Sequence, residues 1–116
     1  MAKEKYNVAV VGALGVVGTE VIKTLERRNF PVAEFRPLDI PENAGKEVMF
    51  NGTSVKVQAA VKENFKDIDI AIFSAGATAS HALAPQAVEM GAVVVDNSTA
   101  YRMAVSYTHL RAHETV

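Results

Sequence analysis

Three evenly spaced glycines constrain the fold of this chain more than any other feature. Gly12, Gly15 and Gly18 directly follow the run Tyr6–Val11 (YNVAVV), whose apolar, β-branched composition predicts a buried strand. Residues Val16–Arg28 then place apolar side chains on one helical face and charged ones largely on the other. Gly-x-x-Gly-x-x-Gly between a strand and a helix is a variant of the dinucleotide-binding fingerprint.

The physical chemistry of such a turn favours binding of a nucleotide. Glycine tolerates the positive φ of a tight strand-to-helix turn, so Gly12 and Gly15 suit the turn itself. A backbone without side chains lets a pyrophosphate approach closely, and the N–H groups and dipole of the first helical turn attract its charge. Gly18 would let the helix pack close to the sheet. A glycine-rich turn without any ligand is the alternative.

Strands and helices alternate along the rest of the chain. The first predicted elements are a strand at Ala33–Leu38, where Pro37 suggests an edge or a strand end, and a loop at Asp39–Lys46. A hairpin of Glu47–Phe50 and Thr53–Val57 around Asn51-Gly52 follows, and then a short helix at Ala59–Phe65 and a strand at Asp69–Phe73. The last elements are a helix at Ser80–Met90, capped by Thr78 or Ser80 and ended by Gly91, and a strand at Ala92–Val95. This alternation predicts parallel βαβ units with right-handed crossovers. We therefore expect a Rossmann-like, doubly wound α/β fold with a mainly parallel sheet and a small hairpin insertion.

Composition narrows the classes of function. A length of 116 residues suits one domain. The net charge of −1 argues against a nucleic-acid surface, no apolar run approaches the ~20 residues that span a bilayer, and the N-terminus lacks a secretion signal. We expect a cytoplasmic protein. With no cysteine, the chain has no disulfide, thiolate metal site or cysteine nucleophile, and no metal site is expected.

The last thirteen residues do not fit the alternation. Residues 104–116 read AVSYTHLRAHETV and show no clear amphipathic period. His109 and His113 taken alone would suggest a metal site, but a non-packing tail is the better interpretation. The string also resembles translated adapter sequence. The expected organisation is a dinucleotide-binding domain at 1–103 followed by a non-native or disordered tail at 104–116.

Two carboxylates follow the predicted second strand. Asp39 lies 21 positions after Gly18, close to the ~20 residues at which an acidic residue usually binds the adenosine ribose. A carboxylate there would accept a hydrogen bond from the ribose 2′-hydroxyl and repel a 2′-phosphate, and Glu42 could act in the same way. If so, the site favours NAD over NADP. A solvated loop carboxylate is the alternative for each residue.

Two further loops follow strands at the same predicted edge of the sheet. Ser74, Ala75 and Gly76 follow one strand and Asn97 follows another, and small or polar residues there would let a cofactor lie across the edge. Arg102 could clamp a phosphate or a carboxylate with two hydrogen bonds. Ordinary loops and a solvated arginine are the alternatives.

Several segments together resemble one known family. NVAVVGALGVVG, LERRNFPV, NAGKEVMFNG, DIAIFSAGA and GAVVVDNSTAYRM resemble, in the same order, the N-terminal domain of aspartate-semialdehyde dehydrogenases. The resemblance covers about Tyr6–Met103. It implies an oxidoreductase, homo-oligomeric as a whole enzyme, that uses NADPH to convert L-aspartyl 4-phosphate to aspartate semialdehyde for lysine, threonine and methionine biosynthesis. The alternatives are a related N-acetyl-glutamyl-phosphate reductase and a stand-alone nucleotide-binding module without catalysis.

The resemblance also implies roles for particular positions. Ala13, Leu14, Gly15 and Val16 would line the cofactor pyrophosphate, Ser74, Ala75 and Gly76 would lie near the cofactor, Asn97 would lie near the nicotinamide, and Arg102 would grip the substrate phosphate.

The chain departs from the family pattern at three places. Leu14 stands where the family usually has threonine. The family stretch Ser-x-Arg-Ser aligns with Ile40-Pro41-Glu42-Asn43, so Glu42 replaces the arginine that would hold a 2′-phosphate, and Asn43 replaces a serine beside it. The family's catalytic cysteine, substrate-binding arginine and histidine base are absent. We expect a cofactor-binding part, for NADP or NAD, that is inactive by itself because it lacks a nucleophile.

Overall fold

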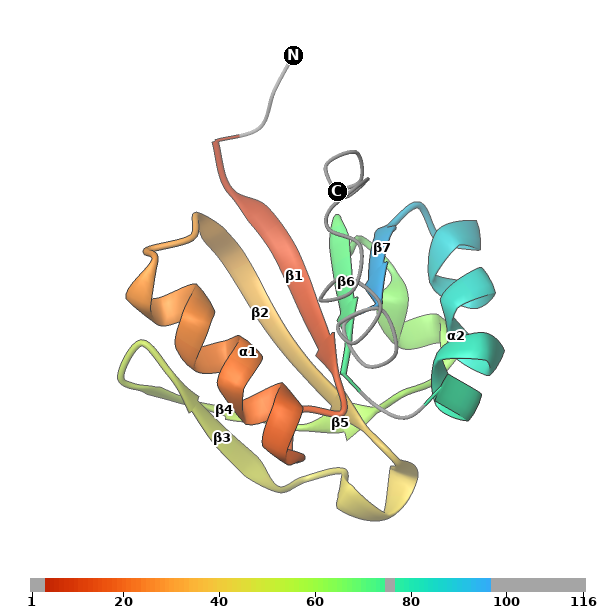
Figure 1. The fold of residues 1–116 in the computed structure, drawn as a ribbon, viewed down its shortest axis with the longest axis horizontal. Coiled ribbons are helices and arrows are strands. Elements are labelled where there is room, and N and C mark those ends of the chain that lie inside the picture. The colour runs from red at the N-terminus through yellow and green to blue at the C-terminus, as the bar shows by residue number, and fades with distance from the viewer. Residues whose placement is uncertain (1–3, 75–76, 97–116) are drawn as a thin grey trace, which may run out of the picture.

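The computed structural model describes residues 4–74 and 77–96, and within 77–81 it describes the backbone alone. Within these residues the chain forms a five-stranded sheet flanked by helices, with a separate two-stranded hairpin (Figure 1). The sheet order is β5-β2-β1-β6-β7, and every neighbouring pair is parallel. Its strands are β1 (Tyr6–Val11), β2 (Val32–Asp39), β5 (Gln58–Ala59), β6 (Ile70–Phe73) and β7 (Val93–Asp96). The predicted Rossmann-like α/β fold is confirmed.

Strand β1 lies at the centre of the sheet and separates two hydrophobic layers. Helix α1 (Val16–Arg27) covers one face, where Val10 is buried beneath it. Helix α2 (Ala77–Glu89) covers the opposite face, where its Ala87 packs in the same cluster as Val11 (Figure 1). Because successive side chains of a strand point to opposite faces, the apolar run of β1 supplies both layers.

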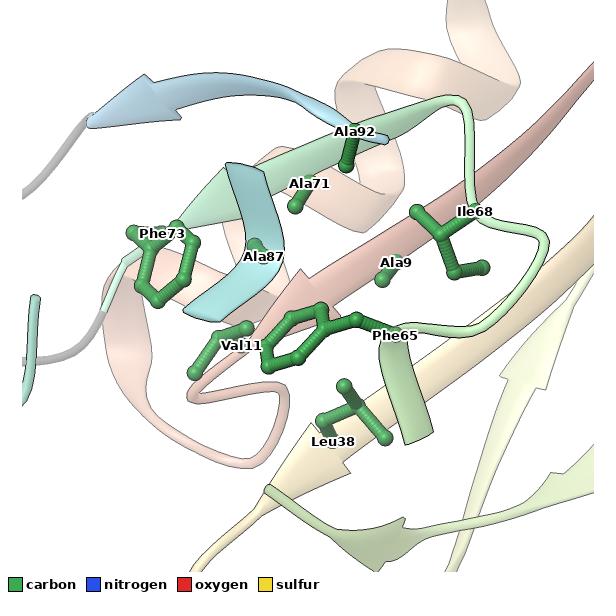
Figure 2. Packing of buried hydrophobic residues seen from close by; sticks show 9 residues of the cluster. All are labelled: Ala9, Val11, Leu38, Phe65, Ile68, Ala71, Phe73, Ala87 and Ala92. Atoms are coloured by element: carbon green, nitrogen blue, oxygen red, sulfur yellow. The ribbon is translucent and has the colours of Figure 1, made fainter. Parts of the chain in front are cut away.

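The layer under α2 is the larger cluster of buried side chains. Its members are Ala9, Val11, Leu38, Phe65, Ile68, Ala71, Phe73, Ala87 and Ala92. Phe65 belongs to the short 3₁₀ helix η2 (Lys62–Phe65) and stacks on Phe73, with ring centroids 6.0 Å apart. Figure 2 shows its ring pointing into the cluster, toward Val11 and Leu38.

The hairpin extends the layer on the α1 side. It consists of β3 (Glu47–Phe50) and β4 (Thr53–Lys56), which pair antiparallel. Asn51 and Gly52 both have positive φ, 50° and 81°, as predicted for an Asn-Gly turn. Phe50 stacks on Phe35 of β2 at 4.4 Å between ring centroids. The hairpin is thereby attached to the sheet by its one buried aromatic side chain.

The predicted short helix at Ala59–Phe65 is wrong in its first part. Gln58–Ala59 form β5, which pairs in parallel with Leu38 and Asp39, and only Lys62–Phe65 are helical. The cause is long-range, because the N–H of Ala60 donates to the carbonyl oxygen of Asp39 at 2.7 Å and continues the pairing. A two-residue strand has no periodicity of its own to reveal it.

The region around Pro37 and the following loop is also more ordered than expected. Strand β2 includes Asp39, and Pro41–Asn43 form a 3₁₀ turn, η1. Strand β2 is not an edge strand, but β5 covers only its last two residues. Pro37, which has no N–H to donate, therefore lies where the outer side of the strand has no partner among the described residues.

The second helix begins earlier than predicted. Helix α2 starts at Ala77, so Thr78 and Ser80 lie inside it and neither is its N-cap. Alanine at 77 and 79 has the best helix propensity of any residue, which is consistent with the earlier start. Gly91 ends the region as predicted, with a φ of 98°.

Strands β6 and β7 are covered on one face only within the described residues. Ala71 and Phe73 are buried against α2, whereas on the α1 side Val93 and Val95 are 64% and 39% exposed. The apolar sequences of these two strands, DIAIF and AVVV, favour buried strands, and the exposure of Val93 and Val95 corrects that expectation on the α1 side. Another right-handed crossover outward from β7 would place its helix on the α2 face as well.

An exposed ion pair joins η2 to α2. Lys62 Nζ lies 2.7 Å from Glu89 Oε1. This hydrogen bond and the opposite charge raise the pKa of Lys62 and lower the pKa of Glu89. The contribution of Glu89 to stability is therefore present at neutral pH and lost as the carboxyl is protonated in acid. Exposed pairs of this kind stabilise a fold only slightly.

Among the described helices, none has the length and apolar character needed to cross a membrane.

Candidate functional site

The glycine turn is tied to the end of the second strand. Gly12 has a φ of 86°, which a glycine adopts without strain. The N–H groups of Gly12 and Ala13 both donate to the carbonyl oxygen of Leu38, at 2.8 Å and 3.2 Å, and the N–H of Gly15 donates back to the carbonyl oxygen of Gly12 at 3.1 Å. The turn is thus held in one conformation by backbone hydrogen bonds.

The first turn of α1 presents unpaired donors. Gly15 is the N-cap and has no side chain to cap the helix, and the first turn contains no acidic residue. Within the described part of the chain, the N–H groups of Val16, Val17 and Gly18 make no hydrogen bond. These three donors and the positive end of the helix dipole could hold an anion.

The third glycine allows a close backbone approach. A Cβ built on Gly18 would lie 2.0 Å from the carbonyl oxygen of Gly12 and 3.0 Å from the Cα of Ala13. At Gly15 a Cβ would lie 3.6 Å from the same oxygen, an ordinary contact. Position 18 must therefore be glycine for the turn to close, whereas position 15 has room for a side chain on its protein side.

Asp39 connects the turn to the end of β2. Its Oδ2 accepts the N–H of Leu14 at 3.1 Å. Its Oδ1 accepts the N–H of Ile40 at 2.7 Å and Nδ2 of Asn43 at 3.3 Å. The residue is half-buried. The carboxylate predicted to meet the adenosine ribose therefore lies directly beside the glycine turn.

Glu42 and Asn43 lie in η1, just beyond Asp39. Asn43 is half-buried and holds the turn through its bond to Asp39, while Glu42 is exposed. The structure thus brings Asp39 and Asn43 into contact and leaves the Glu42 carboxylate at the surface.

Ser74 fixes the end of β6 against the glycine turn. Its N–H donates to the carbonyl oxygen of Val11 at 2.9 Å. Its Oγ donates to the same oxygen at 2.7 Å and lies 3.3 Å from the carbonyl oxygen of Gly12. The strand ends of β1, β2 and β6 therefore meet at one point. The other predicted site residues, Ala75, Gly76, Asn97 and Arg102, lie outside the described residues, as does the tail 104–116.

A groove of about 520 Å³ runs along α1, beginning at its first turn. Along the helix it extends from Val16 to Leu25, and Ile72 and Val95 border it from the sheet. Its lining is apolar apart from Glu20 and Thr24. The groove lies where β6 and β7 lack a covering helix in the described structure.

Sequence reasoning missed the way the turn is held. The carbonyl oxygen of Leu38 accepts two consecutive N–H groups, and no side-chain pattern signals such a role. The bond between Asp39 and the Leu14 N–H was also missed, because the two residues lie 25 positions apart. In the described residues no group of three or more histidine and carboxylate side chains is arranged to hold a metal ion.

Comparison with known proteins identifies the family of this chain. The family model of the semialdehyde dehydrogenase NAD-binding domain matches residues 7–110. The aspartate-semialdehyde dehydrogenase of Bacillus subtilis is 50% identical over 97 residues, which cover 84% of this chain and 28% of that protein.

Solved structures of aspartate-semialdehyde dehydrogenases have a similar fold over most of this chain. Aspartate-semialdehyde dehydrogenase II of Vibrio cholerae, complexed with ASA, has a TM-score of 0.76 and 44% identity over 80% of this chain and 30% of its own. The Candida albicans enzyme with NADP has a TM-score of 0.67 and 24% identity, covering 84% and 31%, a likeness of fold. The chain spans under a third of the length of these proteins. By its match over residues 7–110, the chain belongs to the semialdehyde dehydrogenase family and carries that family's NAD-binding domain.

Proposed function

We propose that this chain is the cofactor-binding part of an aspartate-semialdehyde dehydrogenase, acting in the cytoplasm. The observation that carries the proposal is the uncapped N-terminus of α1, whose three unpaired N–H groups adjoin the glycine turn. The identity of 50% with the Bacillus subtilis enzyme supports the choice within the family. The reaction would be reduction of an acyl phosphate, L-aspartyl 4-phosphate, to the semialdehyde.

The pyrophosphate would be held by the N–H groups of Val16 and Val17, with Gly18 behind them. The N–H groups of Ala13 and Leu14 have acceptors within the protein, so these residues would shape the turn and not bind the phosphates. When bound, the nicotinamide supplies the hydride chemistry. Ser74 would support the floor beneath the cofactor.

The remaining contacts are proposed from the family pattern. Ala75 and Gly76 would lie along the cofactor, Asn97 would lie near the nicotinamide, and Arg102 would hold the phosphate of the substrate with two hydrogen bonds. The whole enzyme would be a homo-oligomer.

Cofactor choice would follow from the carboxylates after β2. The resemblance to the family implies NADP as the cofactor. In this chain, however, Glu42 stands where the family has an arginine that would neutralise the 2′-phosphate. Asp39 adds a second negative charge beside the same position. We therefore propose that NAD binds at least as well as NADP to this chain.

Replacing Gly15 with alanine tests the nucleotide site. The unaltered chain should bind NAD, measured by titration calorimetry. The variant should remain folded, since its Cβ makes only an ordinary contact, but the new methyl group would stand beside the phosphate donors. We expect affinity for NAD to fall about tenfold or more, as for loss of one charge-assisted hydrogen bond. Equal affinity in the two proteins, with both folded by circular dichroism, would contradict the proposed position of the pyrophosphate.

The chain by itself should show no dehydrogenase activity. The reaction requires a nucleophile that forms a covalent intermediate, and the 116 residues contain no cysteine. The measurement is the phosphate-dependent reduction of NAD or NADP with aspartate semialdehyde, followed by absorbance, with a full-length relative as positive control. A rate above the buffer background from the pure chain would show the assignment of roles to be wrong.

A further inference from the structure

One carboxylate touches two parts of the site that would hold neighbouring groups of a dinucleotide, the pyrophosphate and the adenosine ribose. Asp39 Oδ2 accepts the N–H of Leu14, inside the turn that precedes the phosphate donors, at 3.1 Å. Oδ1 accepts the N–H of Ile40 and Nδ2 of Asn43, in the segment beyond β2 where the adenosine ribose would lie. The residue is half-buried, so these bonds are partly shielded from water.

The hydrogen bonds of Asp39 leave room for one more donor. An ionised carboxylate offers about four acceptor positions. Three are used, two on Oδ1 and one on Oδ2, and the remaining position is on Oδ2, the oxygen that faces the turn. A ribose 2′-hydroxyl has one hydrogen to donate there. A 2′-phosphate brings negative charge to the same place and is repelled.

We propose that Asp39 is at once the specificity-determining residue for a dinucleotide with a free 2′-hydroxyl and the positioning residue of the pyrophosphate turn. The two roles are coupled, because the oxygen that would accept the hydroxyl is the one that holds the Leu14 N–H. This inference rests on the proposed function, since it assumes that a nicotinamide dinucleotide occupies the site.

The positioning role follows from which acceptor each N–H group of the turn has. The donors of Gly12, Ala13 and Gly15 are bound by backbone oxygens, and that of Leu14 by Asp39 alone. Without the carboxylate, the Leu14 N–H loses its acceptor and the turn loses its one side-chain link to β2. The donors of the next residues, which would meet the phosphates, then lose their fixed orientation.

Two substitutions separate charge from positioning. Asp39→Asn removes the charge but keeps an amide oxygen that can accept the Leu14 N–H. Asp39→Ala removes both. Asp67→Asn is the matched control, because Asp67 is an exposed aspartate in the loop before β6, at the opposite end of the strands, and asparagine tolerates its φ of 65°. The probes are NAD and NADP by titration calorimetry, and hydrogen exchange of the Leu14 amide by NMR without nucleotide.

The unaltered chain should bind NAD more tightly than NADP and protect the Leu14 amide. Asp39→Asn should lower the ratio of NAD to NADP affinity about tenfold, the size of one charge-assisted interaction, with the amide still protected. Asp39→Ala should lower the ratio equally, expose the amide and weaken both nucleotides. Asp67→Asn should leave both affinities within about twofold.

Each contrary result has a distinct meaning. If the Asp39→Asn variant keeps the original affinity ratio, the specificity role is overturned. If the Leu14 amide stays protected in folded Asp39→Ala, the positioning role is overturned, and either result defeats the coupled proposal while the proposed function stands. If the unaltered chain binds neither nucleotide, the proposed function falls and this inference falls with it.

Discussion

Replacing Gly18 with alanine should lower the free energy of unfolding by about 3 kcal/mol or more, because overpacking against rigid neighbours is strongly destabilising. The added Cβ would lie 2.0 Å from the carbonyl oxygen of Gly12 and 2.9 Å from its carbonyl carbon. Both are backbone atoms, and the turn that contains them is fixed by hydrogen bonds to Leu38. The better helix propensity of alanine, about 1 kcal/mol, cannot offset this overlap. Urea denaturation followed by circular dichroism measures the loss.

The matched control is alanine at Gly15, one turn earlier on the same segment. Its backbone has a φ of −79°, which alanine adopts freely, and its Cβ would meet the Gly12 oxygen at 3.6 Å. Its free energy of unfolding should stay within about 0.5 kcal/mol of the unaltered chain. Equal stability of the Gly18 and Gly15 variants would show that the turn can shift, and would refute the account of the third glycine.

Replacing Phe65 with alanine should cost about 3–5 kcal/mol, as expected for deleting a buried aromatic ring. The side chain is fully buried and stacks on Phe73. It is the one buried residue of η2, so its loss leaves a cavity between the sheet and α2 (Figure 2). The measurement is again the free energy of unfolding in urea, compared at constant slope.

Val61→Ala is the comparison for Phe65→Ala. Val61 is the N-cap of the same short helix and is 38% exposed, so its truncation should cost about 1 kcal/mol or less. If Phe65→Ala were as mild as Val61→Ala, the segment between β5 and β6 would not be anchored by its aromatic ring.

The sequence could predict the elements whose signals are local. Three such signals lie within 22 consecutive residues: the apolar run of β1, the glycines after it and the amphipathic pattern of α1. Each of them indicates the conformation of the residues that carry it. The Asn51-Gly52 turn is local in the same sense, because its two positive φ values are properties of those residues. The parallel pairing of the strands followed from their alternation with helices, and the handedness of the crossovers placed the helices on both faces.

The features that the sequence could not predict depend on partners far along the chain. Strand β5 exists because Gln58 and Ala59 pair with the end of β2, and nothing in two residues announces a strand. The spacing from Gly18 did single out Asp39 as a candidate ligand of the ribose. Its bond to Leu14 could not be foreseen, because side-chain spacing says nothing of which backbone donor a carboxylate will meet once the strands are assembled.

The central place of β1 sets an order of events during synthesis. Its first neighbour, β2, leaves the ribosome soon afterwards, but its other neighbour is β6. The N–H of Asn7, at the start of β1, donates to the carboxylate of Asp69, just before β6, and these two residues are 62 positions apart. At ~5–20 residues per second, several seconds pass before that edge can be paired. Throughout that interval the nascent chain presents an open, apolar strand edge, a template for pairing with other chains. Slow synthesis therefore prolongs the time during which β1 can pair with another chain, and fast synthesis shortens it.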